Sequence, residues 1–230
     1  MPQSPSRARI ALTSFGCTVA LMFDAPVEAQ PASTKSPTPQ SIAAPLKVTT
    51  VAEGLQNPWG MAFLPDGRML VTERAGRLRI VGRDGQLSAP LTGLPAVHVQ
   101  GQGGLLDVAL SPGFEQDRLV YLSYSEAGEG GAGTAVARGK LGEHGLESVR
   151  VIWRQTPKVS SGNHWCSRLV FRSDGTLFIT TGDRQNQRPL VQDLSTDIGK
   201  IVRVTTDGSV PPDNPFVGRP GVRPEIWSYG

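Results

Sequence analysis

Three segments of the chain repeat one pattern, in which an apolar run, a turn and a second apolar run follow one another. The segments cover residues 60–73, 106–114 and 167–180. Pro65, Pro112 and Ser173 occupy matching places in them, roughly 47 and 61 residues apart, which is the spacing of β-propeller blades with inserted loops. Because one blade cannot bury its faces alone, the repeat predicts a ring of blades.

Short apolar runs from Leu46 onwards indicate the same all-β fold class. Asp-Gly pairs supply the positive φ that tight hairpins require. The composition, with 27 Gly, 19 Pro and 38% hydrophobic residues, favours one turn-rich domain with few helices. The predicted strands include residues 69–72, 78–81, 119–122, 177–180 and 201–204, and the Asp-Gly pairs are at 66–67, 84–85, 174–175 and 207–208.

The length sets the expected number of blades. About 185 residues remain from Leu46 onwards, which at roughly 45–60 residues per unit gives three or four blades. Residues 225–230 are typical of a strand that enters a turn. We therefore expect residues 46–230 to be the N-terminal part of a larger β-propeller, whose open blade edges favour aggregation or a dimer.

The first residues are typical of a secretory signal. Arg7 and Arg9 precede an apolar run over residues 10–23, and residues 27–29 offer small side chains at the usual cleavage spacing. We predict a signal peptide over residues 1–29, and hence a periplasmic or secreted protein. The apolar run is short and interrupted by polar residues, so no stable membrane span is expected.

Two further features bear on the domain boundary and on localisation. Residues 30–45 are rich in Pro, Ser and Thr without apolar periodicity, which predicts a disordered linker before a domain at 46–230. Cys17 leaves a lipid anchor open as an alternative, although the residues before it fit such a site poorly. Removal of the signal would leave Cys166 without a disulfide partner, and we interpret it as a small buried residue.

Charge and motifs argue against three kinds of ligand. The net charge is +3, but the basic residues are scattered singly among acidic ones, so we expect no nucleic-acid binding. No Gly-x-Gly-x-x-Gly loop follows a strand and opens a helix, so NAD is not expected. Asp213 and Asn214 form a predicted turn with too few oxygen ligands for calcium.

The polar stretch at residues 160–168 is the strongest candidate site. His164 lies in it at a predicted junction between a loop and a strand, flanked by Asn163 and Trp165. Loops on rigid sheets carry function, and an imidazole with an unperturbed pKa of roughly 6.5 is a neutral proton acceptor at neutral pH. The stretch therefore predicts a general base at His164.

Four stretches of the sequence occur in the order and approximate spacing of one known family. They are residues 101–114, 160–168, 182–189 and 199–203 with 213–216. Together they resemble the soluble PQQ-dependent glucose and aldose sugar dehydrogenases, and the resemblance runs from about Leu46 to Gly230. It implies a six-bladed β-propeller that holds PQQ and calcium and oxidises aldose sugars to lactones, with an external electron acceptor.

The resemblance also implies roles for single residues. His164 matches the histidine that removes the proton from the anomeric hydroxyl while hydride passes to the quinone. Gln102 and Gln187 match positions that line the substrate pocket, and Asn163 matches a position that is Asp in the glucose dehydrogenases. Most of the residues that bind PQQ and calcium are expected beyond residue 230, so no metal ligand is predicted in this chain.

Other polar and aromatic residues have a structural interpretation. Asp183 and Arg184 are interpreted as an exposed pair that contributes little to stability. His98 and His144 lie in polar stretches with no partner at ligand spacing, which favours a surface role. Trp59 is interpreted as an anchor that packs a blade.

Other functions and roles stay open. A non-catalytic propeller fragment or binding module would use the same fold without a quinone. A calcium-dependent propeller lactonase is disfavoured, because no cluster of carboxylates indicates a bare metal site. Gln102 and Gln187 could equally brace turns rather than contact a substrate.

Overall fold

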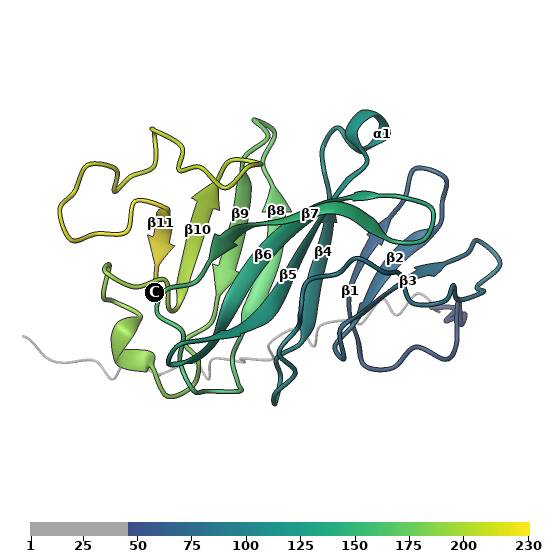
Figure 1. The fold of residues 1–230 in the computed structure, drawn as a ribbon, viewed down its shortest axis with the longest axis horizontal. Helices are drawn as coiled ribbons and strands as arrows, with labels where there is room; N and C mark the ends of the chain where they lie inside the picture. Colours follow the sequence, from purple (N-terminus) through teal and green to yellow (C-terminus); the bar gives the residue numbers. More distant parts are fainter. Residues whose placement is uncertain (1–45) are drawn as a thin grey trace, which may run out of the picture. The chain divides into compact units, whose positions relative to one another are not determined.

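The computed structural model describes residues 46–230. The predicted signal peptide, the linker and Cys17 lie outside these residues. Residues Val48–Gly230 form one compact unit, whose strands are labelled in Figure 1. In this described part, no helix is long and apolar enough to cross a membrane.

Three antiparallel sheets make up the unit, and each consists of strands that follow one another along the chain. The first sheet contains β1 (Pro58–Phe63), β2 (Met69–Glu73) and β3 (Arg77–Val81). The second contains β4 (Leu105–Leu110), β5 (Leu119–Gly128), β6 (Gly131–Leu141) and β7 (Leu146–Arg154). The third contains β8 (Cys166–Phe171), β9 (Leu177–Thr181), β10 (Lys200–Val204) and β11 (Ile226–Tyr229).

The all-β prediction is confirmed, and the five predicted strands lie within β2, β3, β5, β9 and β10. Only two short helical segments occur among the described residues, α1 (Phe114–Asp117) and the 3₁₀ helix η1 (Arg188–Leu190). The three sheets fall within the expected three or four blades. The first of them has three strands, which the sequence pattern did not indicate.

Local turn chemistry explains why two of the three repeated segments form tight hairpins. Gly67 and Gly175 have φ values of 85° and 83°, as their turns require. The Asp66 carboxylate accepts the Arg68 N–H at 3.0 Å, and the Asp174 carboxylate accepts the Thr176 N–H at 2.9 Å. The middle segment differs, because α1 lies in its turn between β4 and β5.

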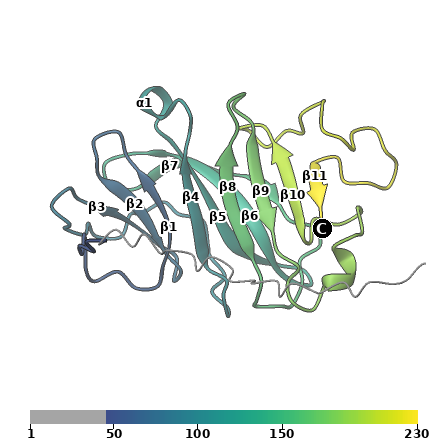
Figure 2. The same ribbon diagram turned by 180° about the vertical axis from the view of Figure 1, so that it is seen from behind.

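The sheets pack face to face through their apolar side chains. The first strands of successive sheets, β1, β4 and β8, contact one another, and Figures 1 and 2 show them in this order from both sides. One hydrophobic core lies between the first and second sheets and includes Leu70 and Val108. A second lies between the second and third sheets and includes Tyr121 and Leu169. The middle sheet is therefore covered on both faces.

Each first strand carries a β-bulge at the same place. The register shifts between Pro58 and Met61 in β1, between Leu105 and Val108 in β4, and between Cys166 and Leu169 in β8. A bulge bends its strand and re-aims the neighbouring side chains. In β8 the bulge lies at the end of the polar stretch around His164, where the loop passes into the strand.

Candidate functional site

The loop that leads into β8 alternates between exposed and buried side chains. His164 is exposed and has a positive φ of 51°, whereas Trp165 is buried. The indole Nε1 of Trp165 donates to the carbonyl of Gly162 at 2.9 Å. A residue with a β-carbon tolerates this backbone region only where its surroundings hold it there. The buried Trp165 and its hydrogen bond thus hold His164 at the surface.

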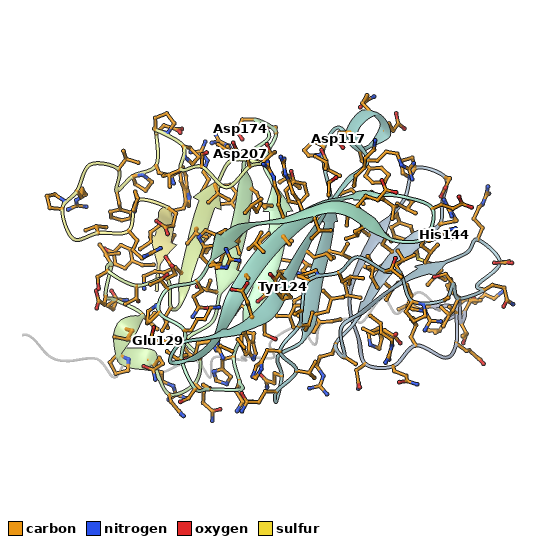
Figure 3. All side chains as sticks on the ribbon, viewed as in Figure 1. Asp117, Tyr124, Glu129, His144, Asp174 and Asp207 are labelled. Atoms are coloured by element: carbon orange, nitrogen blue, oxygen red, sulfur yellow. The ribbon has the colours of Figure 1, made fainter. Side chains whose placement is uncertain are left out.

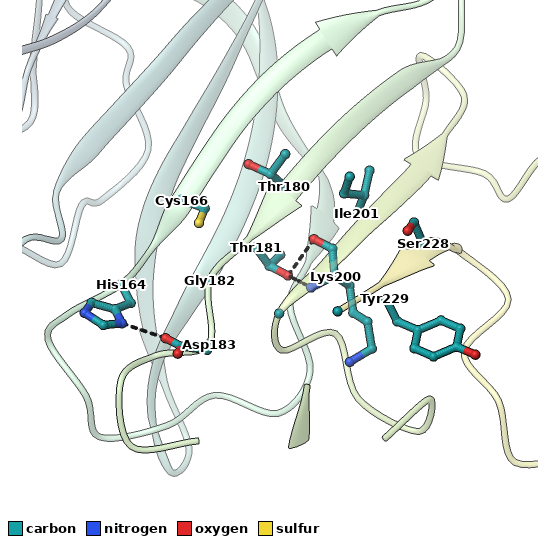
Figure 4. A pocket seen from close by; sticks show the side chains of 12 residues that line it. His164, Cys166, Thr180, Thr181, Gly182, Asp183, Lys200, Ile201, Ser228 and Tyr229 are labelled. Carbon is teal, nitrogen blue, oxygen red and sulfur yellow. Dashed lines mark hydrogen bonds and ion pairs between the residues drawn. The ribbon is translucent and has the colours of Figure 1, made fainter. Parts of the chain in front are cut away.

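Asp183 holds one ring nitrogen of His164. The Nδ1 atom of His164 lies 2.7 Å from Oδ1 of Asp183, which follows β9 (Figure 4). The same oxygen accepts the N–H of Gln185 at 2.9 Å. This backbone hydrogen bond, followed by the contact with His164, lowers the pKa of Asp183. A carboxylate at Nδ1 keeps the proton there, so that Nε2 is left as the proton acceptor.

Gln102 joins the loop before β4 to the His164 loop. Its side-chain Oε1 atom accepts a hydrogen bond from the backbone N–H of His164 at 2.8 Å, and its backbone N–H donates to the carbonyl of Gly162 at 2.8 Å. Gln102 and His164 both line a pocket of about 470 Å³, together with Trp59 and Arg74. Gln102 therefore braces a turn and lines the same pocket as His164.

The two other predicted substrate residues differ in position. The Nδ2 group of Asn163 donates to Oε1 of Gln185 at 2.5 Å, so Asn163 lies beside the Asp183 loop. Gln187 is half-buried, its N–H donates to the carbonyl of Asp183, and its side chain does not line the pocket shared by Gln102 and His164. The structure thus brings Gln102 and His164 together at one pocket, whereas neither Asn163 nor Gln187 lines it.

The interpretation of Asp183 and Arg184 as an exposed pair is wrong. Asp183 pairs with His164, and the Arg184 side chain is fully buried. The guanidinium of Arg184 stacks 3.3 Å from the centre of the Trp165 ring and donates to the carbonyls of Asn163, Ala132 and Ser161. Burial lowers the pKa of Arg184 to about 10. These contacts attach the buried Arg184 side chain to the loop that carries His164.

Cys166 also differs from its predicted state. The residue is exposed rather than buried, and together with His164 it lines two pockets. Partial burial of the thiol, together with the nearby charge of Asp183, raises the pKa of Cys166. The thiol is therefore protonated at neutral pH and a poor nucleophile.

The remaining singled-out residues have structural surroundings. His144 lies in the turn between β6 and β7, exposed and away from the other labelled residues in Figure 3. Trp59 packs against Leu106, Ala132 and Trp165, which confirms its interpretation as a packing anchor. The Asp213 carboxylate pairs with Arg203 at 3.0 Å.

His98 and Asn214 are likewise engaged locally. The Nε2 atom of His98 lies 3.3 Å from Oε1 of Gln100, two residues along the loop. The amide of Asn214 donates to the carbonyls of Arg203 and Pro224, as a side chain that closes a turn would. Over residues 46–230 no group of three or more His, Cys, Asp or Glu side chains is placed to hold a metal ion.

Comparison with known proteins assigns the chain to a family. A family model described as Glucose / Sorbosone dehydrogenase matches residues 55–230. The chain belongs to this family. Over 191 residues it is 50% identical to aldose sugar dehydrogenase YliI of Escherichia coli (strain K12), an alignment that covers 81% of this chain and 51% of that protein.

Solved structures of family members share the fold. The soluble aldose sugar dehydrogenase from Escherichia coli in the apo-form matches with a TM-score of 0.76 at 51% identity, covering 79% of this chain and 53% of that one. The PQQ-bound form of aldose sugar dehydrogenase from Streptomyces coelicolor matches with a TM-score of 0.70 at 34% identity, covering 80% and 53%. The predicted β-propeller and the predicted sugar dehydrogenase family are confirmed. The chain spans about half the length of these relatives.

Sequence reasoning missed Asp183, Gln185 and Arg184 as parts of the site. Each follows β9, at the end of the strand that pairs with the strand after His164. An acidic residue directly after a strand that neighbours a candidate base is the signal that could have indicated Asp183. Nothing in the sequence distinguishes the buried Arg184 from a surface arginine.

Proposed function

We propose that this chain carries the general base of a PQQ- and calcium-dependent dehydrogenase that oxidises aldose sugars to lactones. The observation that carries the proposal is the contact of 2.7 Å between Asp183 and Nδ1 of His164, at a pocket shared with Gln102. The names of its relatives support the substrate class and the quinone. An external electron acceptor and a periplasmic or secreted location belong to the same proposal.

The residues around the pocket fit one wall of a PQQ site. PQQ is a flat anionic quinone that would, when bound, accept the two electrons of the oxidation as one hydride. Arg74 lines the pocket and supplies a cation suited to a carboxylate, and it is held there by its hydrogen bond to the carbonyl of Gly101. The described residues contain no group of three or more His, Cys, Asp or Glu side chains that could hold calcium.

The hydrogen bonds define what each side chain can offer a sugar. Asp183 keeps a proton on Nδ1 of His164, so Nε2 accepts the proton of the anomeric hydroxyl. The Oε1 atom of Gln102 is engaged by the His164 N–H, which leaves the Nε2 group of Gln102 to donate to a sugar hydroxyl. Asn163 uses its Nδ2 group on Gln185, so its Oδ1 atom is left to accept.

The proposal is tested in a chimera, because the chain spans about half of its relatives. Residues 55–230 replace the matching part of aldose sugar dehydrogenase YliI, and dye reduction with glucose is followed with added PQQ and calcium. We expect turnover that needs both additions and falls by about 100-fold or more in His164→Gln, since general-base catalysis contributes about that much. The matched control His144→Gln replaces an exposed histidine in a distant turn and should retain full turnover.

Two outcomes would overturn the proposal. A folded chimera that binds PQQ but reduces no dye would show that these residues do not provide the base. Equal losses in His164→Gln and His144→Gln would remove the special role of His164. For the 230-residue chain on its own we expect little or no dye reduction, and calorimetric titration with PQQ distinguishes a quinone site from a module that binds sugar alone.

A further inference from the structure

The peptide group between Asn163 and His164 is held at both of its polar ends. Its carbonyl oxygen accepts a hydrogen bond from Nε of Arg184 at 3.1 Å, and its N–H donates to Oε1 of Gln102 at 2.8 Å. Gln102 belongs to the loop before β4, and Arg184 belongs to the loop after β9. Two separate parts of the chain therefore fix the orientation of this one peptide plane.

This orientation determines the backbone conformation at His164. Rotation of the peptide plane changes ψ of Asn163 and φ of His164 together, and the φ of His164 is 51°. A residue with a β-carbon is disfavoured in this left-handed region and stays there only where its surroundings impose it. Without the two hydrogen bonds the plane is free to turn, which returns φ to negative values and changes the direction of the imidazole ring.

The backbone after His164 is held by close packing. A β-carbon built on Gly182 would lie 1.7 Å from the carbonyl oxygen of His164, so the two backbones lie against each other (Figure 4). The N–H of Gly182 also donates to the carbonyl of Trp165 at 3.2 Å. Because the chain after His164 is fixed in this way, the peptide group before it decides where the imidazole ring points.

Arg184 holds the plane strongly because its charge has no carboxylate partner among residues 46–230. The side chain is fully buried, and its guanidinium donates to three backbone carbonyls, those of Ala132 and Ser161 in addition to Asn163. A buried cation depends on such dipoles, since no solvent compensates its charge. Turning the Asn163 carbonyl away would remove part of that compensation, which makes the turn unfavourable.

The contacts of Arg184 lie on both sides of His164. The guanidinium stacks on the ring of Trp165, the residue after His164, at 3.3 Å from the ring centre. The Arg184 side chain is already fully enclosed by the described residues, so its environment does not depend on any other part of the protein. Arg184 thus fixes the neighbours of His164 and leaves the His164 side chain exposed at the pocket that it shares with Gln102.

We propose that Arg184 is a positioning residue for the sugar oxidation, and that with Gln102 it clamps the Asn163–His164 peptide group and so aims His164 at the pocket. The inference rests on the proposed function, in which His164 is the general base. Gln102 has two roles, because its Oε1 atom holds the peptide group while its Nε2 group is left for a sugar hydroxyl. Asp183 sets the tautomer of the imidazole, and the clamp sets its direction.

Crystal structures of the chimera test the clamp without any measurement of activity. In Arg184→Met we expect the Asn163–His164 peptide plane to turn and the φ of His164 to become negative. Methionine is flexible and keeps a contact with Trp165, and apolar side chains often replace buried charges without loss of the fold. A φ of His164 that stays near 51° would overturn the proposal. If Arg184→Met does not fold, Gln102→Ala decides in the same way, since Gln102 is exposed.

Kinetics separate positioning from a merely structural role. Arg184→Met should lower kcat of the chimera about 10- to 100-fold, the effect of one hydrogen bond to a charged group, with little change in KM for glucose. In the His164→Gln chimera the same substitution should leave the residual dye reduction unchanged, because no base remains to be aimed. Equal losses in the two backgrounds would show that Arg184 only supports the fold, which overturns the proposal.

Arg203→Met is the matched control. Arg203 is a similarly buried arginine in β10 that pairs with Asp174 and Asp213, and it contacts neither loop of the site. This variant should lose stability in urea denaturation but keep the kcat of the folded enzyme, and a fall in kcat equal to that of Arg184→Met would contradict the clamp. A parent chimera that reduces no dye overturns the proposed function instead, and the φ of His164 in the crystal structures then decides on the clamp alone.

Discussion

Two aspartates, Asp107 and Asp183, bind similar partners in different surroundings. Asp107 lies in the bulge of β4, fully buried, and accepts hydrogen bonds from Arg168 and from the N–H of Leu169, both at 2.8 Å. Asp183 lies after β9, half-buried, and contacts His164 and the N–H of Gln185. Burial raises the pKa of Asp107. In contrast, the hydrogen bonds that Asp183 accepts, first of all the one from the N–H of Gln185, lower the pKa of Asp183.

This difference separates a structural carboxylate from a functional one. Asp107 ties the second sheet to the third, and its partners compensate a charge that solvent does not reach. Asp183 remains partly hydrated, so its charge is retained at little cost and can orient an imidazole. Removing Asp107 should therefore change stability, and removing Asp183 should change the chemistry at His164.

The largest effect is expected for Asp107→Ala. The substitution leaves the N–H of Leu169 without a partner inside the junction between the second and third sheets, and we expect the free energy of unfolding to fall by about 3 kcal/mol. Urea denaturation followed by circular dichroism measures it. Asp66→Ala is the matched control, because the exposed pair of Asp66 and Arg68 should be worth less than about 1 kcal/mol. Equal losses in both variants would remove the structural role of Asp107.

Asp183→Asn should have the converse effect. An amide no longer keeps the proton on Nδ1 of His164, so we expect dye reduction by the chimera to fall about 10- to 100-fold, as is typical when a partner that orients histidine is lost. The free energy of unfolding should change by less than about 1 kcal/mol. Asp193→Asn is the control, because Asp193 also accepts a backbone N–H, that of Ser195, but contacts no histidine. A large loss of stability in Asp183→Asn would contradict the comparison.

Sequence reasoning succeeded where the determinants are local. The Asp-Gly turns at 66–67 and 174–175 specify their hairpins within four residues. Gln102 and His164, which are 62 residues apart and line one pocket, were indicated only by the family resemblance. Sequence reasoning assigned no role to Asp107 and was wrong for Arg184, whose partners lie 61 and 52 residues away in the chain, respectively. A charged residue is normally read as exposed, and only the packed sheets reveal that Arg184 rests on Trp165 among carbonyl groups.

The smallest effect, and the most direct comparison, is the pH dependence of stability. The folded-state pKa of Asp183 lies below the unfolded value of about 3.9, so its contribution is complete above that value and is lost as the pH falls through the folded pKa. The stability difference between the parent chain and Asp183→Asn should therefore shrink as the solution is acidified.

The folded-state pKa of Asp107 lies above the unfolded value of about 3.9, so between these two pKa values the native state binds more protons than the unfolded state. The difference between the parent chain and Asp107→Asn should then shift in favour of the parent on acidification. Urea denaturation at several pH values on both sides of about 3.9 measures both changes. If both differences move in the same direction, the two carboxylates do not have the opposite surroundings described above.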